Sequence, residues 1–113
     1  MAPPSQLAIA TSAVNRLVKE EASYHKELEH QQVRIEKLKQ ASSDEENAEW
    51  NLKQENRALE ETKAMFPQLR KRIQESLAKL EQQLEQGEQN NPEEITKAKE
   101  AVASASTAIR ETS

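Results

Sequence analysis

The two histidines are the first residues whose chemistry could define a site, because imidazole binds metals and transfers protons near neutral pH. His25 and His30 lie five residues apart, which places them roughly 140° apart around a helix. A zinc site on a helix needs two histidines four residues apart, and the chain has no cysteine to supply thiolate ligands. We therefore interpret both histidines as solvated side chains and expect no metal site.

No other residues form a catalytic arrangement. Carboxylates are abundant, but pairs such as Glu45-Glu46 and Glu60-Glu61 are explained more simply as solvated helix faces than as acids in an apolar pocket. Serine, threonine and histidine form no nucleophile motif, and the single glycine leaves no phosphate-binding loop. The sequence therefore predicts a protein that is not an enzyme and that uses no cofactor.

One basic cluster, Arg70-Lys71-Arg72, is a candidate contact for an anionic partner. It is short and is followed by Glu75, and the whole chain carries 16 basic against 20 acidic residues, a net charge of −4. Nucleic-acid binding needs a clear basic excess, so we expect no nucleic-acid partner. We interpret the cluster as part of a helix face that could still contact an acidic protein surface.

Membrane insertion is not expected either. The chain has no run of about 18 apolar residues, and its first residues, Met1–Ser5, lack the basic and apolar regions of a secretory signal. We expect a soluble cytoplasmic protein.

The elements that must position any site are helices, because Glu, Gln, Lys, Ala and Leu dominate the sequence. The first helix is predicted over about residues 7–40, where apolar residues repeat in heptads. Its seam is interrupted only by the polar residues Glu21 and Gln31. The seam positions are Leu7, Ala10, Val14, Leu17, Glu21, Tyr24, Leu28, Gln31, Ile35 and Leu38.

Two further helices are predicted over about residues 44–85 and 92–111. The second starts with a capping box at Ser43–Glu46 and carries an apolar stripe that continues through Pro67, which indicates a kink and not a loop. Gly87 suits a helix C-cap, and Asn91 followed by Pro92 is typical of a helix start. Short connections between helices favour antiparallel neighbours.

The predicted fold is all-α: an elongated antiparallel three-helix bundle with coiled-coil-like packing, and with the second helix kinked at Pro67. Residues 1–6 are expected to be a disordered lead, with Ser5 capping the first helix. Residues 7–113 are expected to form a single domain. Tyr24 and Phe66 fall in the apolar stripes and are predicted core residues, whereas Trp50 either covers the end of the bundle or is an exposed anchor.

Several segments together resemble the tubulin-binding cofactor A family. Their order and spacing match the family over about residues 7–85, and the proline in the middle of the second helix adds to the resemblance. The segments are Asn15–Glu21, Tyr24, Lys26–Leu28, Ile35–Lys39, Leu52–Glu55, Leu59–Lys63 and Met65–Pro67.

The resemblance implies a three-helix tubulin-folding cofactor, without nucleotide, that holds β-tubulin after its release from the cytosolic chaperonin. It also implies transfer toward assembly of the α/β heterodimer, with other tubulin-folding cofactors and the microtubule cytoskeleton as further associations. Within and beside the matching segments we expect exposed partner-binding residues that steer capture by charge. They are Arg16, Lys19, Glu20, Lys53, Glu60, Lys63, Arg70 and Lys71.

Two alternatives from other classes stay open on the residues alone. One is a self-associating coiled-coil structural or tethering protein. The capped third helix favours closure within one chain, but the polar seam residues Glu21 and Gln31 leave monomer or homodimer open. The other is a prefoldin-like holdase, which would need β-hairpins between its helices. Residues 41–47 are short and polar, without the alternation that predicts strands.

Overall fold

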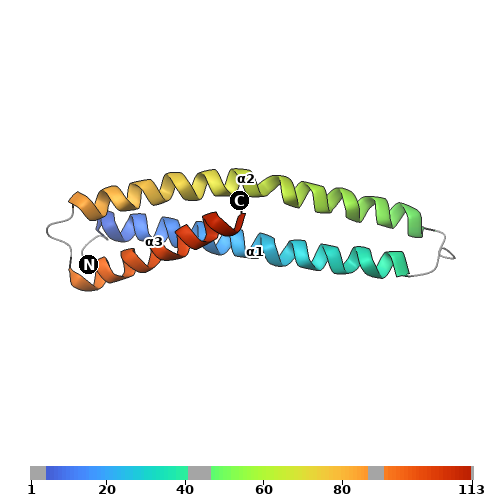
Figure 1. Ribbon diagram of the computed structural model, residues 1–113, viewed down its shortest axis with the longest axis horizontal. Coiled ribbons are helices and arrows are strands. Elements are labelled where there is room, and N and C mark those ends of the chain that lie inside the picture. The colour runs from blue at the N-terminus through green and yellow to red at the C-terminus, as the bar shows by residue number, and fades with distance from the viewer. Residues whose placement is uncertain (1–4, 41–46, 87–90, 113) are drawn as a thin grey trace. The chain divides into compact units, whose positions relative to one another are not determined.

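A computed structural model describes residues 5–40, 47–86 and 91–112 (Figure 1). It contains three helices, α1 (Gln6–Gln40), α2 (Ala48–Gln86) and α3 (Pro92–Thr112). These helices account for nearly all of the described residues, and no strand occurs among them, so the predicted all-α class is confirmed. None of the helices in this part of the chain has the length and apolar content that a membrane span requires.

Side-chain caps fix where two of the helices begin. The hydroxyl of Ser5 accepts a hydrogen bond from the Ala8 amide at 3.0 Å, and the amide oxygen of Asn91 accepts one from the Glu94 amide at 2.8 Å. Each bond satisfies one of the amides that a helix N-terminus leaves without an intrahelical partner. Both predicted caps are therefore confirmed, and α1 begins at Gln6, one residue before the predicted start at residue 7.

The remaining predicted end signals fall outside the described residues. They are the first residues of the lead, the capping box at Ser43–Glu46 with the helix start near residue 44, and the C-cap at Gly87. Within the described residues α2 begins at Ala48. The Asn47 carbonyl accepts the Asn51 amide at 2.8 Å and so closes the first turn.

The chain separates into two compact units, which we name by their place in the sequence. The terminal unit comprises Met1–Glu21 and Pro67–Ser113, and the central unit comprises Ala22–Phe66. Helices α1 and α2 each contribute to both units, whereas α3 belongs to the terminal unit alone. The single domain expected over residues 7–113 stays a prediction.

The core of the terminal unit is built by all three helices. A hydrogen bond of 3.0 Å from the Ser5 hydroxyl to the Glu94 carboxylate joins the first turns of α1 and α3. These two helices therefore run in the same direction, and α2 runs antiparallel to both (Figure 1). Alanines on α3 allow close approach of the helices. The buried core residues are Leu7, Val14, Ile73, Leu80, Ala98, Ala101, Ala105 and Ala108.

The central unit pairs residues 22–40 of α1 with residues 48–66 of α2. Its most buried side chains are Gln31, Ile35 and Thr62. The remaining apolar seam residues are half-buried, as expected where two helices pack without a third. They are Tyr24, Leu28, Leu38, Leu52, Leu59 and Phe66.

The heptad pattern identified the buried face of α1 correctly. Every predicted seam position is buried or half-buried, including the polar residues Glu21, at 3% exposure, and Gln31, at 5%. Helix α2 likewise continues through Pro67, as the unbroken apolar pattern predicts, and the kink expected at this residue stays a prediction. The division between the two units falls directly before this proline.

Candidate partner-binding surface

The residues predicted to bind a partner divide between the two units. On α1 of the terminal unit, Arg16 and Lys19 are exposed, and Glu20 is half-buried. Glu20 precedes the buried Glu21 on the helix, so part of its side chain is covered by the packed face. Arg16 and Lys19 lie one turn apart and can both reach the same partner.

Arg70 and Lys71, on α2 of the same unit, differ from the expectation of full exposure. Lys71 is exposed, but Arg70 is half-buried, and its Nε atom is buried without a hydrogen-bond partner among the described residues. The cause is its position between Leu69 and Ile73, which are both fully buried. A long arginine side chain lying along an apolar surface covers that surface with its methylene groups. Arg70 is therefore a packing residue in part, and the basic cluster is not one uniform patch.

The predicted residues of the central unit, Lys53, Glu60 and Lys63, are all exposed on α2. The Lys63 ammonium lies 3.7 Å from the Glu60 carboxylate. Exposed pairs of this kind contribute at most about 1 kcal/mol and exchange partners readily. Lys63 and Glu60 can consequently leave each other for charges on a second protein.

The structure corrects the interpretation of one histidine. His30 is exposed, but His25 is half-buried, and its ring lies 4.5 Å from the ring of Phe66 at 32°. The seam position of Phe66 places its ring against the neighbouring helix, so His25 packs on it instead of being fully solvated. Trp50, for which two interpretations were open, is 62% exposed and does not cover a core.

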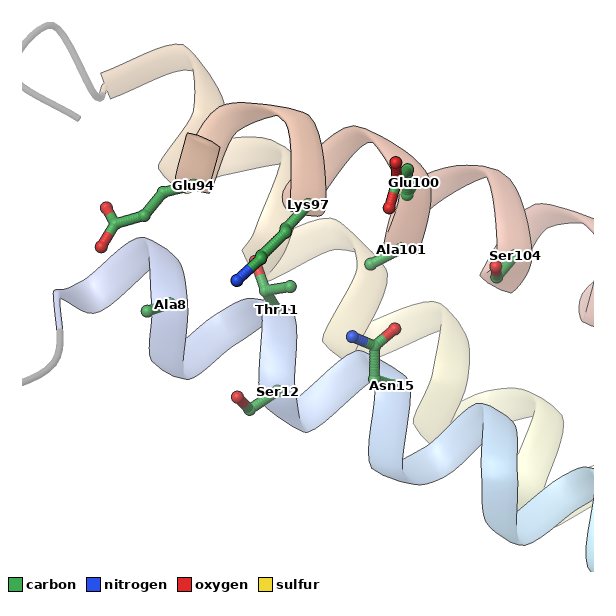
Figure 2. Close-up of a pocket in the computed structure, with 9 residues that line it drawn as sticks. All are labelled: Ala8, Thr11, Ser12, Asn15, Glu94, Lys97, Glu100, Ala101 and Ser104. Atoms are coloured by element: carbon green, nitrogen blue, oxygen red, sulfur yellow. The ribbon is translucent and has the colours of Figure 1, made fainter. Parts of the chain in front are cut away.

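A shallow groove of about 430 Å³ runs between α1 and α3 of the terminal unit. Figure 2 shows the lining side chains of α1 on one side and those of α3 on the other, with Lys97 extending toward α1. The groove is open to solvent and exposes polar and apolar surface in about equal measure, so it can receive side chains of a partner but cannot exclude water from a reaction. Its lining residues are Ala8, Thr11, Ser12, Asn15, Glu94, Lys97, Glu100, Ala101 and Ser104.

Arg34 of the central unit lies between two carboxylates and forms an ion pair with each of them. Hydrogen bonds to Glu55, at 3.3 Å, and to Glu27, at 3.2 Å, raise the pKa of its guanidinium above the ordinary value. The bond to Glu55 links α1 to α2. The described residues contain no cluster of acidic or histidine side chains that could hold a metal ion.

The sequence pattern described as "Tubulin binding cofactor A" matches residues 2–102. The chain belongs to the tubulin binding cofactor A family. Similar relatives come from organisms as different as yeast and mouse. "Tubulin-specific chaperone A" of Saccharomyces cerevisiae is 35% identical over 102 residues, which cover 90% of this chain and 92% of the yeast protein. "Tubulin-specific chaperone A" of Mus musculus is 37% identical over 96 residues, covering 85% and 83% of the two chains.

A solved structure of the tubulin binding cofactor A family has the same fold. The crystal structure of tubulin folding cofactor A from Arabidopsis thaliana matches with a TM-score of 0.76 and 36% identity. The match covers 89% of this chain and 92% of the plant chain.

Sequence reasoning did not single out the α3 side of the groove. The signal was available, because Lys97, Ala101 and Ser104 follow each other at spacings of four and three and therefore share a helix face. That this face of α3 lies across the groove from α1 follows only from the packing of the terminal unit, which the sequence alone does not give.

Proposed function

We propose that this protein is a cytoplasmic tubulin-folding cofactor that captures β-tubulin released from the chaperonin and passes it toward heterodimer assembly. Membership of the tubulin binding cofactor A family over most of the chain is the observation that carries this proposal. Relatives are named as tubulin-specific chaperones and not as enzymes, so the proposed role is binding without catalysis. Other tubulin-folding cofactors are proposed as further partners, with the microtubule cytoskeleton as a site of association.

The exposed surface supports a role in binding. Arg16, Lys19, Lys53 and Lys71 are exposed cations on long helices, and charges of this kind steer association and fix which partner is accepted. Capture through many modest contacts also allows release, because no single contact dominates the affinity. The remaining proposed contacts are Glu20, Glu60, Lys63 and Arg70, of which Glu20 and Arg70 can contribute only their exposed parts.

The test is a binding experiment with β-tubulin freshly released from chaperonin. The mixture is separated by native gel filtration, and assembled α/β heterodimer is run in parallel. We expect a complex with free β-tubulin and a weak or absent one with the heterodimer. The absence of a complex with either form would contradict the proposal, and self-association of the protein would then be measured.

A charge-reversed variant tests the proposed contacts. Reversing Lys19 and Lys63 to glutamate should weaken capture of β-tubulin about tenfold, because two exposed cations become repulsive to an acidic partner. The matched control reverses Lys79 and Lys99, which are exposed and lie outside the proposed contacts. Circular dichroism should show unchanged helicity in both variants. Equal capture by the Lys19/Lys63 variant and the wild type would exclude these two residues as contacts.

A further inference from the structure

Trp50 is the residue of the central unit that neither the packing nor the contacts proposed above explain. Its side chain is 62% exposed, more than the other exposed large apolar side chains of the described residues, Ile9 at 47% and Val33 at 52%. Tryptophan is highly buried on average in folded proteins, because its ring is a large apolar surface. The exposed ring of Trp50 therefore keeps apolar surface in water without stabilising the fold.

The chain has one tryptophan, one tyrosine and one phenylalanine, and the other two are used in packing. Tyr24 and Phe66 are half-buried in the seam, and the Phe66 ring lies 4.5 Å from the ring of His25. Trp50 precedes the seam residue Leu52 by two residues, which places it about 200° away around helix α2. Trp50 consequently points away from the seam, and the packing of the central unit does not require it.

The backbone that carries Trp50 is ordered without a partner. Helix α2 begins at Ala48, and the turn around Trp50 is closed by a hydrogen bond of 2.8 Å from the Asn51 amide to the Asn47 carbonyl. A tryptophan side chain has only two side-chain torsions, so little conformational freedom is lost when a complex fixes it. Trp50 therefore has the properties of a preorganised binding residue.

The surroundings of Trp50 are polar and exposed. Lys53 lies one turn further along the same face of α2, and Arg57, two turns along, lies 3.7 Å from Glu61. An apolar centre with a polar rim is the usual arrangement of a binding hot spot, in which the rim excludes water from the central residue. Glu49 is also exposed here, so the charges around Trp50 are of both signs. The indole ring, and not the charge, distinguishes this surface.

The chemistry of the indole ring determines which partner surface can receive it. A ring that protrudes from a helix fits a concave apolar recess, where its burial stabilises the complex. The indole N–H is a donor, and a buried donor without an acceptor is costly. The recess must therefore also contain a hydrogen-bond acceptor. A folded protein partner can supply both features in one place.

We propose that Trp50 anchors this protein to β-tubulin, with its indole ring buried in an apolar recess of β-tubulin and its N–H donating to an acceptor there. This inference rests on the proposed function, which supplies the partner. It adds an apolar contact to the charged contacts assigned above. Lys53, one of those charged contacts, lies one turn from Trp50, so Trp50 extends the proposed surface toward the start of α2.

Binding of β-tubulin freshly released from chaperonin to full-length variants tests the anchor. Trp50→Ala should raise the Kd about thirtyfold, because truncation of a hot-spot tryptophan removes its whole buried ring. Trp50→Phe should raise the Kd about threefold, because phenylalanine keeps an apolar ring but loses the N–H donor. Both ratios should be the same at low and at physiological salt, since the contact is not an ion pair.

Val33→Ala is the matched control, because Val33 is also an exposed apolar residue of the central unit and should change the Kd by less than about twofold. Circular dichroism should show equal helicity in all variants. Equal binding by the wild type and Trp50→Ala would overturn the inference while the proposed function stands. An equal loss for Val33→Ala would also overturn it, because any exposed apolar group would then have the same effect. Failure of the wild type to bind β-tubulin would overturn both.

Trp50 can also be observed directly in the complex, because it is the one tryptophan of the chain. Protein produced with 5-fluorotryptophan should give a single fluorine NMR signal, whose shift differs between H₂O and D₂O. This solvent dependence should disappear when unlabelled β-tubulin is added. A signal that still responds to solvent in the complex would overturn the inference, since the ring would remain exposed. A protein that sediments as a dimer and shows no solvent dependence by itself would also overturn it, because a second copy would cover Trp50.

Discussion

Polar residues in the seam of α1 are the main feature at the scale of single residues. Gln31 is 5% exposed, and its Oε1 atom is buried without a hydrogen-bond partner among the described residues. The buried threonines of the interior, in contrast, have hydrogen-bond partners for their hydroxyl groups. The Thr11 hydroxyl donates to the Leu7 carbonyl at 2.8 Å, and the Thr62 hydroxyl donates to the Ala58 carbonyl at 3.1 Å. A buried acceptor without a donor costs about 1–3 kcal/mol, so Gln31 lowers the free energy of unfolding.

Replacement of Gln31 by leucine should therefore raise the free energy of unfolding by about 1 kcal/mol, because it removes the unpaired acceptor and adds apolar contact. Chemical denaturation followed by circular dichroism measures the change. Gln32→Leu is the matched control, since Gln32 is exposed and should leave stability within about 0.5 kcal/mol. A destabilised Gln31→Leu variant would show that the amide forms a needed interaction.

The opposite effect is expected in the core of the terminal unit. Ile73 is 0% exposed and packs in the cluster formed by all three helices, so Ile73→Ala should lower the free energy of unfolding by about 3 kcal/mol. Trp50→Ala is the control, because Trp50 is 62% exposed and its truncation should change stability by less than about 0.5 kcal/mol. Similar losses for the two variants would contradict the assigned core.

At the scale of elements, short-range sequence signals determine where the helices begin and where their backbone hydrogen bonding is interrupted. Ser5 and Asn91 start α1 and α3 through side-chain caps, and Asn47 stands before α2. Pro67 is the exception, because it lies inside α2 and is exposed. Its missing N–H leaves the carbonyl of Lys63 without the usual helical donor. The apolar stripe on both sides keeps the helix intact despite this loss.

Pro67→Ala should consequently raise the free energy of unfolding by about 1–3 kcal/mol, since alanine restores the backbone hydrogen bond and removes the ring clash. Thermal and chemical unfolding of the purified variant measure the gain. Pro92→Ala is the matched control, because a proline at the first position of a helix costs nothing and its removal should give no gain. If Pro67→Ala gave no gain either, the strain assigned to α2 at Pro67 would be absent.

The sequence predicted the elements better than it predicted the surface. Heptad spacing identified the buried face of α1, including Glu21 and Gln31, because a helix of regular pitch fixes which residues share a face. It did not predict that Arg70 is partly covered or that His25 packs on Phe66. Those outcomes depend on the side chains of a neighbouring helix, and no periodicity within one helix encodes them.

At the scale of the whole molecule, the two units differ in how they are stabilised. The terminal unit encloses fully buried aliphatic side chains such as Leu7, Ile73 and Leu80 among three helices. The central unit has two helices, and most of its apolar seam is half-buried. The predicted helix lengths agree with this difference, because a third helix of about 20 residues is too short to pack along the full length of two helices of about 34 and 42 residues.

Hydrogen exchange should therefore be uneven along α1 and α2. Backbone amides of residues 24–38 and 50–64 should exchange faster than those of residues 10–20, 70–84 and 96–108, since fewer buried contacts oppose local opening. Hydrogen exchange with mass spectrometry on the intact protein measures this directly. Equal protection along each long helix would contradict the difference in stability between the two units.

The division of the chain also has a consequence for synthesis on the ribosome. The central unit is one continuous stretch, Ala22–Phe66, so all of its partners are available once that stretch has emerged. The terminal unit joins Met1–Glu21 to Pro67–Ser113, and the bond between Ser5 and Glu94 needs residues made almost a whole chain apart. Long-range closure is slow and exposes apolar surface meanwhile. The core residues Leu7 and Val14, which lie on α1, must therefore wait for α3 before they are covered on every side.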